Sequence, residues 1–238
     1  MKLGFTLAEV LITLGIIGIV AAMTIPNLMT KLQKSQIEAQ VKENYSNIMQ
    51  TMKMSENDDV PAMDVIQNIG GNKKWFETFI APYMKVEQVC YSQAGCWHKY
   101  GEVKNLKNGA PYFETQLENS ESQIGTVGKT MTFKTAKGAW YDVNSSLGVT
   151  TGSFFGINTP NNTFQFYFDV NGARKPNRIG KDIYIMIYDP DKGFIPAGHD
   201  KTKEQVRDNC FNGDGYWCLE YLRANGWVIP DQVWKRKK

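Results

Sequence analysis

The acidic residue Glu9 is an isolated charge in a strongly apolar segment near the N-terminus. From Phe5 to Ile25 the sequence carries no other charged residue. At about 1.5 Å rise per residue, a helix over this segment reaches roughly 32 Å, which is enough to cross the hydrocarbon core of a bilayer. A carboxylate inside such a span is costly, so its default interpretation is a functional residue that has a cationic partner.

The partner of Glu9 must come from outside its own span, since no lysine or arginine lies between Phe5 and Ile25. Cleavage of the peptide bond after Gly4 would create a new α-amine on Phe5, in the same stratum of the membrane as Glu9. That amine, on a neighbouring chain, is the natural counter-ion. Two copies staggered along a common axis would pair Glu9 of one with Phe5 of the other, and the buried charge would then direct assembly.

The segment GFTLAEVLITLGIIGIVAAMTIPNLM, which begins at Gly4, closely resembles the processing and assembly segment of the type IV pilin and type II secretion pseudopilin superfamily. The resemblance implies that a prepilin peptidase cuts after Gly4 and methylates the amine of Phe5, and that Glu9 guides docking into a growing filament. It also implies a helix-weakening pair at Gly18 and Pro26, and glycine and proline do weaken a helix interior. The resemblance ends with this segment.

The resemblance further implies a single-pass protein of the bacterial inner membrane, with its N-terminus inside and its head in the periplasm or outside the cell. The expected partners are the lipid bilayer, the prepilin peptidase, an inner-membrane assembly platform, and other copies or related pilins in a helical filament. Charge does not decide the orientation, because Lys2 precedes the span while Lys31 and Lys34 follow it.

Two simpler interpretations of the N-terminal segment compete with this one. A secretory signal peptide also has a lysine near its start and an apolar core, and Val20, Ala21 and Ala22 could form its cleavage site. A plain signal anchor would need no motif at all. Both leave Glu9 unexplained, because neither has a use for a buried acid beside a Gly-Phe junction.

The four cysteines, Cys90, Cys96, Cys210 and Cys218, form two close pairs along the sequence. In an exported chain this favours two disulfides, and among the three connectivities loop entropy favours the two local ones. Zinc is a competing use, but the spacing within each pair misses the usual ligand knuckle. Either pair could instead be reduced and buried. In the superfamily a C-terminal disulfide commonly closes a surface-facing loop, and the second pair resembles it in position.

The periodicity of the chain predicts an α+β protein with one long helix at 5–54 and a globular head at 55–238, and the resemblance implies a leader at 1–4. Beyond Pro26 the long helix becomes amphipathic. One stripe of it is expected to pack against the head: Leu28, Leu32, Ile37, Val41, Tyr45, Ile48 and Met52.

In the head, aromatic and β-branched runs predict an antiparallel sheet laid against the long helix, with strands at 131–135, 139–143, 163–170 and 182–188. Helical patterns predict short helices at 62–69, around 75–83 and at 216–224. Thr202 and Gln205 have the spacing of a capping box, and Asn225 with Gly226 should end the last helix.

Three oxygen-bearing side chains in the head, Asp169, Asn171 and Asp182, could offer ligands to calcium, a hard cation. The simpler interpretation is local structure. Asn171 followed by Gly172 is a hairpin turn signal, and in this interpretation Asp169 caps its own turn. No complete calcium-loop motif matches these residues. Apart from this calcium candidate, no metal or cofactor is predicted.

No constellation of residues indicates an enzyme. The two histidines, His98 and His199, lie outside any metal or nucleophile motif, and His199 with Asp200 is expected to be a solvated pair. The sequence 128–130, GKT, imitates the end of a phosphate loop, but Gln123 stands where that loop needs glycine. The net charge of +3 calls for no nucleic acid. The basic tail from Trp234 onwards is expected to be solvated, without specific binding of nucleic acid.

Together these features predict a structural filament subunit that assembles through a heterologous, non-closing contact. A type IV pilus and a type II secretion pseudopilus share the assembly segment, so both remain open. The alternative is a minor or tip pilin whose head acts as a binding module for DNA or a surface.

Overall fold

The computed structural model describes residues 6–57, 71–91, 95–99, 101–111, 130–146, 154–158, 163–189 and 192–236. The chain divides into two units, Met1–Gln36 and Ile37–Lys238. Helix α1, Leu7–Asn57, begins in the first unit and ends in the second. The predicted leader and the predicted helix at 62–69 lie outside the described residues.

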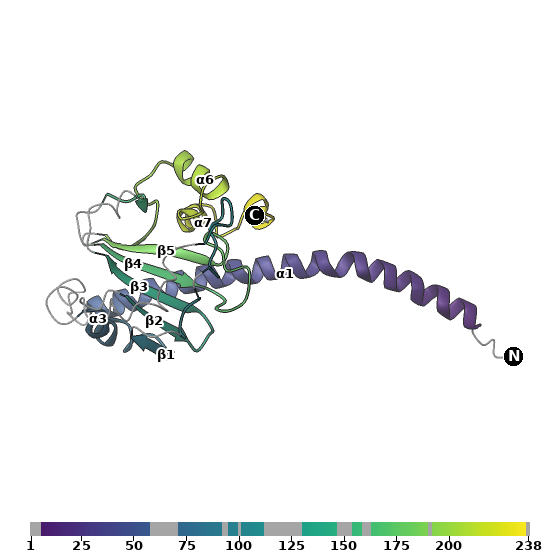
Figure 1. Cartoon of the computed structure of the whole chain (residues 1–238), viewed down its shortest axis with the longest axis horizontal. Helices are drawn as coiled ribbons and strands as arrows, with labels where there is room; N and C mark the ends of the chain where they lie inside the picture. The colour runs from purple at the N-terminus through teal and green to yellow at the C-terminus, as the bar shows by residue number, and fades with distance from the viewer. Residues whose placement is uncertain are drawn as a thin grey trace. The chain divides into compact units, whose positions relative to one another are not determined.

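The second unit is built on a six-stranded antiparallel sheet whose strands follow one another in chain order (Figure 1). The strands are β1 Val86–Tyr91, β2 Thr130–Thr135, β3 Trp140–Ser146, β4 Thr163–Asp169, β5 Ile183–Asp189 and β6 Gly193–Pro196. The short helices are α3 Gly71–Phe79, α6 Lys203–Phe211, α7 Cys218–Ala224 and α8 Asp231–Trp234. Figure 1 shows α7 beside β5, with α6 beyond it, and α3 beside β2. The protein is therefore α+β, as predicted.

The sheet is apolar on both faces because its central strands alternate between two cores. In β4, Phe166 and Phe168 enter one core and Tyr167 enters the other. In β5, Tyr184 and Met186 follow the first pattern and Ile185 the second. Every residue of β5 is buried. Burial on both faces explains why β5 reads as a continuous apolar run in the sequence.

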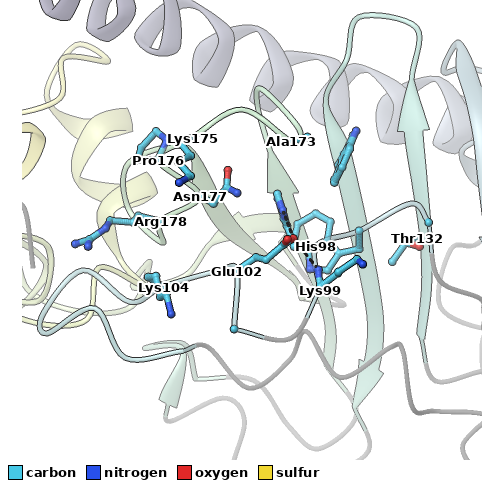
Figure 2. Close-up of a pocket in the computed structure, with 14 residues that line it drawn as sticks. His98, Lys99, Glu102, Lys104, Thr132, Ala173, Lys175, Pro176, Asn177 and Arg178 are labelled. Atoms are coloured by element: carbon cyan, nitrogen blue, oxygen red, sulfur yellow. Dashed lines mark hydrogen bonds and ion pairs between the residues drawn. The ribbon is translucent and has the colours of Figure 1, made fainter.

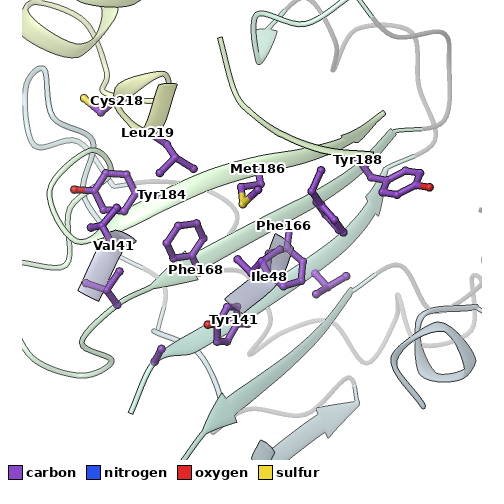
Figure 3. Packing of buried hydrophobic residues seen from close by; sticks show 14 of the residues in the cluster. Val41, Ile48, Tyr141, Phe166, Phe168, Tyr184, Met186, Tyr188, Cys218 and Leu219 are labelled. Atoms are coloured by element: carbon purple, nitrogen blue, oxygen red, sulfur yellow. The ribbon is translucent and has the colours of Figure 1, made fainter. Parts of the chain in front are cut away.

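The larger core lies between the sheet and the second part of α1, residues 37–57 (Figure 3). Ile37, Val41, Ile48 and Met52 recur at helical spacing and are each 4 % exposed or less. Tyr45 is only half-buried there. Across the sheet, the aromatic rings of this core contact one another on neighbouring strands, and such pairs add to the stability that burial provides.

The buried stripe of α1 starts later along the helix than the sequence predicts. Leu28 and Leu32 are 58 % and 56 % exposed, so the face that packs in this structure starts at Ile37. Leucines at helical spacing mark an apolar face but do not say what covers it. The covered part of the stripe is the part that belongs to the head unit.

Polar contacts also fix the second part of α1 to the head. Asn44 Oδ1 accepts a hydrogen bond from the hydroxyl of Tyr141, a core residue of β3. Glu38 Oε1 accepts one from the backbone N–H of Ile229 at 2.8 Å. These buried or half-buried bonds require one register of the helix against the sheet, because a buried polar group without a partner costs about 1–3 kcal/mol.

The structure agrees with the predicted strands at 131–135, 139–143, 163–170 and 182–188 to within one residue at each end, except that β3 runs three residues further than predicted. The capping box at the start of α6 is present, with Thr202 Oγ1 accepting from the Gln205 N–H and the Gln205 side chain accepting from the Thr202 N–H. The strands β1 and β6 and the helix α8 were not predicted.

Candidate functional site

The start of α1 holds Glu9 in a capping box. Glu9 Oε2 accepts hydrogen bonds from the Thr6 backbone N–H at 2.8 Å and from Thr6 Oγ1 at 2.9 Å. The Glu9 N–H donates to Thr6 Oγ1 at 3.3 Å. The sequence prediction sought a cationic partner and missed this cap, although Thr6-x-x-Glu9 is its signature spacing. Gly4 and Phe5, the predicted processing site, lie outside the described residues.

The first part of α1, residues 7–25, exposes apolar side chains all around the helix. The side chains that are more than half exposed there include Leu7, Leu11, Ile12, Leu14, Ile16, Ile17, Ile19, Val20, Met23 and Ile25. Within the described part of the chain, α1 is the one helix long and apolar enough to cross a membrane. A helix that is apolar on all sides needs lipid or other apolar helices around it.

The helix continues without interruption through Gly18 and Pro26, the predicted weakening pair. A Cβ added at Gly18 would meet nothing within 4 Å, so packing within one chain does not require glycine there. Pro26 lacks the N–H that would otherwise bond to the carbonyl of Ala22. The role of the pair in loosening the helix therefore stays a prediction.

The four cysteines form two disulfides, Cys90 with Cys96 and Cys210 with Cys218. These are the local pairs that loop entropy favours. The first ties the loop after β1 back to that strand, and the second joins α6 to the first residue of α7. All four residues are buried.

A buried polar cluster lies where β4 ends. His98 Nε2 is 2.7 Å from Asp169 Oδ2, and the two side chains are 1 % and 0 % exposed. Asp169 Oδ1 accepts from the backbone N–H groups of Asn171 and Gly172, each at 2.9 Å. Burial lowers the pKa of His98 and raises the pKa of Asp169 well above its ordinary value. Both shifts favour the neutral form of each group, because burial removes the water that would hydrate its charge.

Asp182 is the second buried carboxyl of this cluster. Its Oδ2 accepts from the Asn177 N–H at 2.8 Å and its Oδ1 from the Arg178 N–H at 2.7 Å. The amide of Asn171 donates to the same Oδ2 at 3.4 Å. Burial, and next the nearby charge of Asp169, raise the pKa of Asp182 well above its ordinary value. The two aspartates thus hold the connection between β4 and β5 from its two ends.

The structure brings Asp169, Asn171 and Asp182 together, but as turn caps. Their carboxylate oxygens face N–H donors, whereas calcium needs six to eight oxygen ligands. In the described ranges, no group of three or more His, Cys, Asp or Glu side chains is placed to hold a metal. The residues therefore do not fit a calcium site. Gly172 has φ +63°, as a turn glycine should, although the turn opens a connection longer than a tight hairpin.

A cavity of about 940 Å³ lies beside this cluster (Figure 2). We call it the head pocket. Its first wall is the loop after β1, residues 95–99 and 101–104, and its second wall is the segment 173–178. Thr132 and Trp140 contribute from β2 and β3. His98 lines the pocket, although sequence analysis placed it in no motif, since its partner Asp169 is distant in the sequence.

Two other predictions about polar residues were wrong. His199 and Asp200 are half-buried and have different partners: His199 Nδ1 is 3.9 Å from Glu220 Oε2, while Asp200 accepts hydrogen bonds from the Asn158 N–H and from Lys192 Nζ. They are therefore not a solvated pair.

The C-terminal tail was expected to be solvated, but part of it is docked. Lys181 Nζ donates to the carbonyl oxygens of Trp234 and Arg236 at 2.7 and 2.6 Å. Trp234 packs against the larger core. The chain is held as far as Arg236, and the last two lysines lie outside the described residues.

No protein-family model, curated protein or solved structure gives a significant match to the chain. The case for a function therefore depends on the residues and geometry described above.

Proposed function

We propose that this chain is a structural subunit of a type IV pilus-like or type II secretion pseudopilus filament. It would be held in the bacterial inner membrane by the first part of α1, and a prepilin peptidase would cut it after Gly4. The observation that carries the proposal is an apolar helix exposed on all sides, with the single acid Glu9 capping its start. That combination has two surroundings that suit it, a bilayer and a bundle of like helices.

Assembly would exchange one apolar environment for the other. In the membrane, lipid covers the side chains of the first part of α1, and in a filament the same side chains of neighbouring copies cover one another. Apolar packing alone has little preference between these states, because lipid tails are as apolar as leucine. A specific polar contact is therefore needed to set the register of the incoming subunit.

Glu9 has one oxygen available for that contact. Thr6 occupies Oε2, and no described residue bonds to Oε1. In the proposal, the methylated α-amine of Phe5 on a neighbouring chain pairs with this second oxygen. A carboxylate can accept from the helix start and from a cation at once, since its two oxygens offer about four acceptor sites.

A second candidate function is a minor or tip pilin whose head binds DNA or a surface. The observation that favours it is the head pocket, a concave site that a purely structural subunit does not need. The two functions share the membrane helix and differ in the head.

The test compares Glu9→Ala with Glu9→Gln in cells where the variant is the only copy of the chain. The measurement is the ratio of protein in sheared filaments to protein in the membrane fraction. Glutamine can form the same capping box as glutamate but has no charge. If pairing with the Phe5 amine sets the register, both variants stay in the membrane, and the processed chain accumulates there.

Glu87→Ala is the matched control, since Glu87 is an exposed acid on β1. It should assemble like the wild type. Normal assembly of Glu9→Gln would show that only the cap matters and would contradict charge pairing. Normal assembly of both Glu9 variants would contradict the proposal that Glu9 directs filament assembly.

A further inference from the structure

The head pocket is held in shape by contacts from several directions. The disulfide to Cys90 fixes Cys96 in the first wall, and the bond to Asp169 fixes His98. The walls also pair with each other, since the Lys104 N–H donates to the Asn177 carbonyl at 3.0 Å. A cavity whose walls are fixed in advance loses little conformational entropy when a ligand enters.

Four cationic side chains are among the residues that line the pocket (Figure 2). They are Lys99 and Lys104 from the first wall, and Lys175 and Arg178 from the second. Glu102 is the one carboxylate among the described lining residues, and the ammonium groups of Lys99 and Lys104 make no ion pair with any described residue. Opposed cations across a concave surface focus a positive potential into it, so the pocket favours an anionic ligand.

The pocket also offers oxygen acceptors. The Glu102 carboxylate accepts from the Lys99 backbone N–H and has further acceptor capacity. A ligand that satisfies these oxygens must carry hydrogen-bond donors. The phosphodiester groups of a nucleic acid backbone carry no hydrogen-bond donor, so they would match the cations and leave these acceptors unmatched.

We infer that the head pocket binds an acidic saccharide, one that presents a carboxylate together with hydroxyl donors. The carboxylate contacts the lysines of the two walls, and a hydroxyl group donates to the Glu102 carboxylate. Trp97, which lines the pocket and is half-buried, offers an apolar ring to the carbon face of the sugar. A volume of about 940 Å³ is in the range of small-ligand sites and holds a short oligosaccharide.

The experiment is calorimetric titration of the full chain in detergent micelles with trigalacturonate. Maltotriose, inorganic phosphate and a short single-stranded oligonucleotide are titrated in parallel. Trigalacturonate should bind saturably and more weakly as sodium chloride rises, because salt screens the attraction. Maltotriose should give no saturable heat. The measurement uses unassembled chain, so it does not depend on filament formation.

Two variants test which groups carry the binding. Lys104→Ala should weaken trigalacturonate binding about 10-fold or more, as loss of a charged hydrogen bond does. Glu102→Gln should strengthen it by about 3-fold, because it removes a like charge and keeps an acceptor. Lys107→Ala is the matched control: Lys107 is an exposed lysine of the same loop outside the described pocket lining, and the variant should bind like the wild type.

Several outcomes would overturn the inference. One is the absence of saturable trigalacturonate binding by folded wild-type chain. Another is tighter binding of phosphate or of the oligonucleotide, which would assign the pocket to phosphate groups. Equal binding by Lys104→Ala and the wild type, with unchanged melting temperatures, would place any saccharide site elsewhere.

Discussion

His98 in the loop after β1 is bonded to Asp169 at the end of β4, with 2.7 Å between Nε2 and Oδ2. The strands β2 and β3 lie between these two strands in the sheet, so the loop crosses the sheet face to make the bond. The contact thus fixes His98 in the first wall of the head pocket. The Asp169 carboxyl group therefore holds both the loop after β1, through His98, and the turn after β4.

Replacing Asp169 with alanine should destabilise the head by about 3 kcal/mol or more. The change leaves His98 and the backbone N–H groups of Asn171 and Gly172 without their acceptor, and each buried donor without a partner costs about 1–3 kcal/mol. Denaturant unfolding of the full chain in micelles, followed by aromatic fluorescence, measures the change.

Asp169→Asn is the informative comparison for that prediction. Its side-chain oxygen can still accept from the turn, and its amide can donate to His98 in the other tautomer. We expect it to lose clearly less stability than the alanine variant. Equal losses would mean that the turn bonds contribute little and that the negative charge itself matters.

The two disulfides should both be present in protein taken from the membrane. Peptide mapping without reductant should recover Cys90 linked to Cys96 and Cys210 linked to Cys218. Replacing both Cys210 and Cys218 with serine should cost about 2–4 kcal/mol and loosen α6 relative to α7. Free thiols in the exported chain would contradict the predicted compartment, while a bond between the two pairs would contradict the described packing.

Lys181 should make stability rise with pH in the alkaline range. Burial, and next the charge of Arg178, lower its pKa from 10.5 to about 8. Between these values the unfolded chain binds more protons than the folded chain, so the free energy of unfolding increases as pH rises. The neutral amine still has two N–H groups for the carbonyls of Trp234 and Arg236.

The measurement is the free energy of unfolding of the wild type and of Lys181→Met at pH 8 and pH 10.5. Other titrating groups act on both chains alike, so the difference isolates Lys181. The wild type should gain up to about 3 kcal/mol relative to the variant over this range. Parallel pH profiles would show that Lys181 titrates normally.

The strands β2 to β5 could be predicted from sequence because aromatic and β-branched residues dominate them and turn residues separate them. The edge strand β1 could not, since Glu87 and Gln88 break its pattern and its pairing with β2 shifts register there. The strand β6 has four residues and ends in Pro196, which is too short for a periodic signal. Edge position, which the sequence does not state, explains both omissions.

The site shows the same division between local and distant information. The cap at Thr202, the turn at Gly172 and the local disulfides follow from spacings of a few residues. The partners of His98 and Lys181 do not, because they lie 71 and 53 residues away. The pocket forms only when such distant segments meet, so no local sequence motif predicts it.

The most direct test of the filament-subunit account is the mass of the mature N-terminus. Intact-mass and N-terminal peptide analysis of membrane-extracted chain should find that it begins at Phe5 and that its α-amine is methylated. Replacing Gly4 with a bulky residue should leave the precursor uncut. A chain that begins at Met23, or an unprocessed Met1 in a strain with an active prepilin peptidase, would contradict the account.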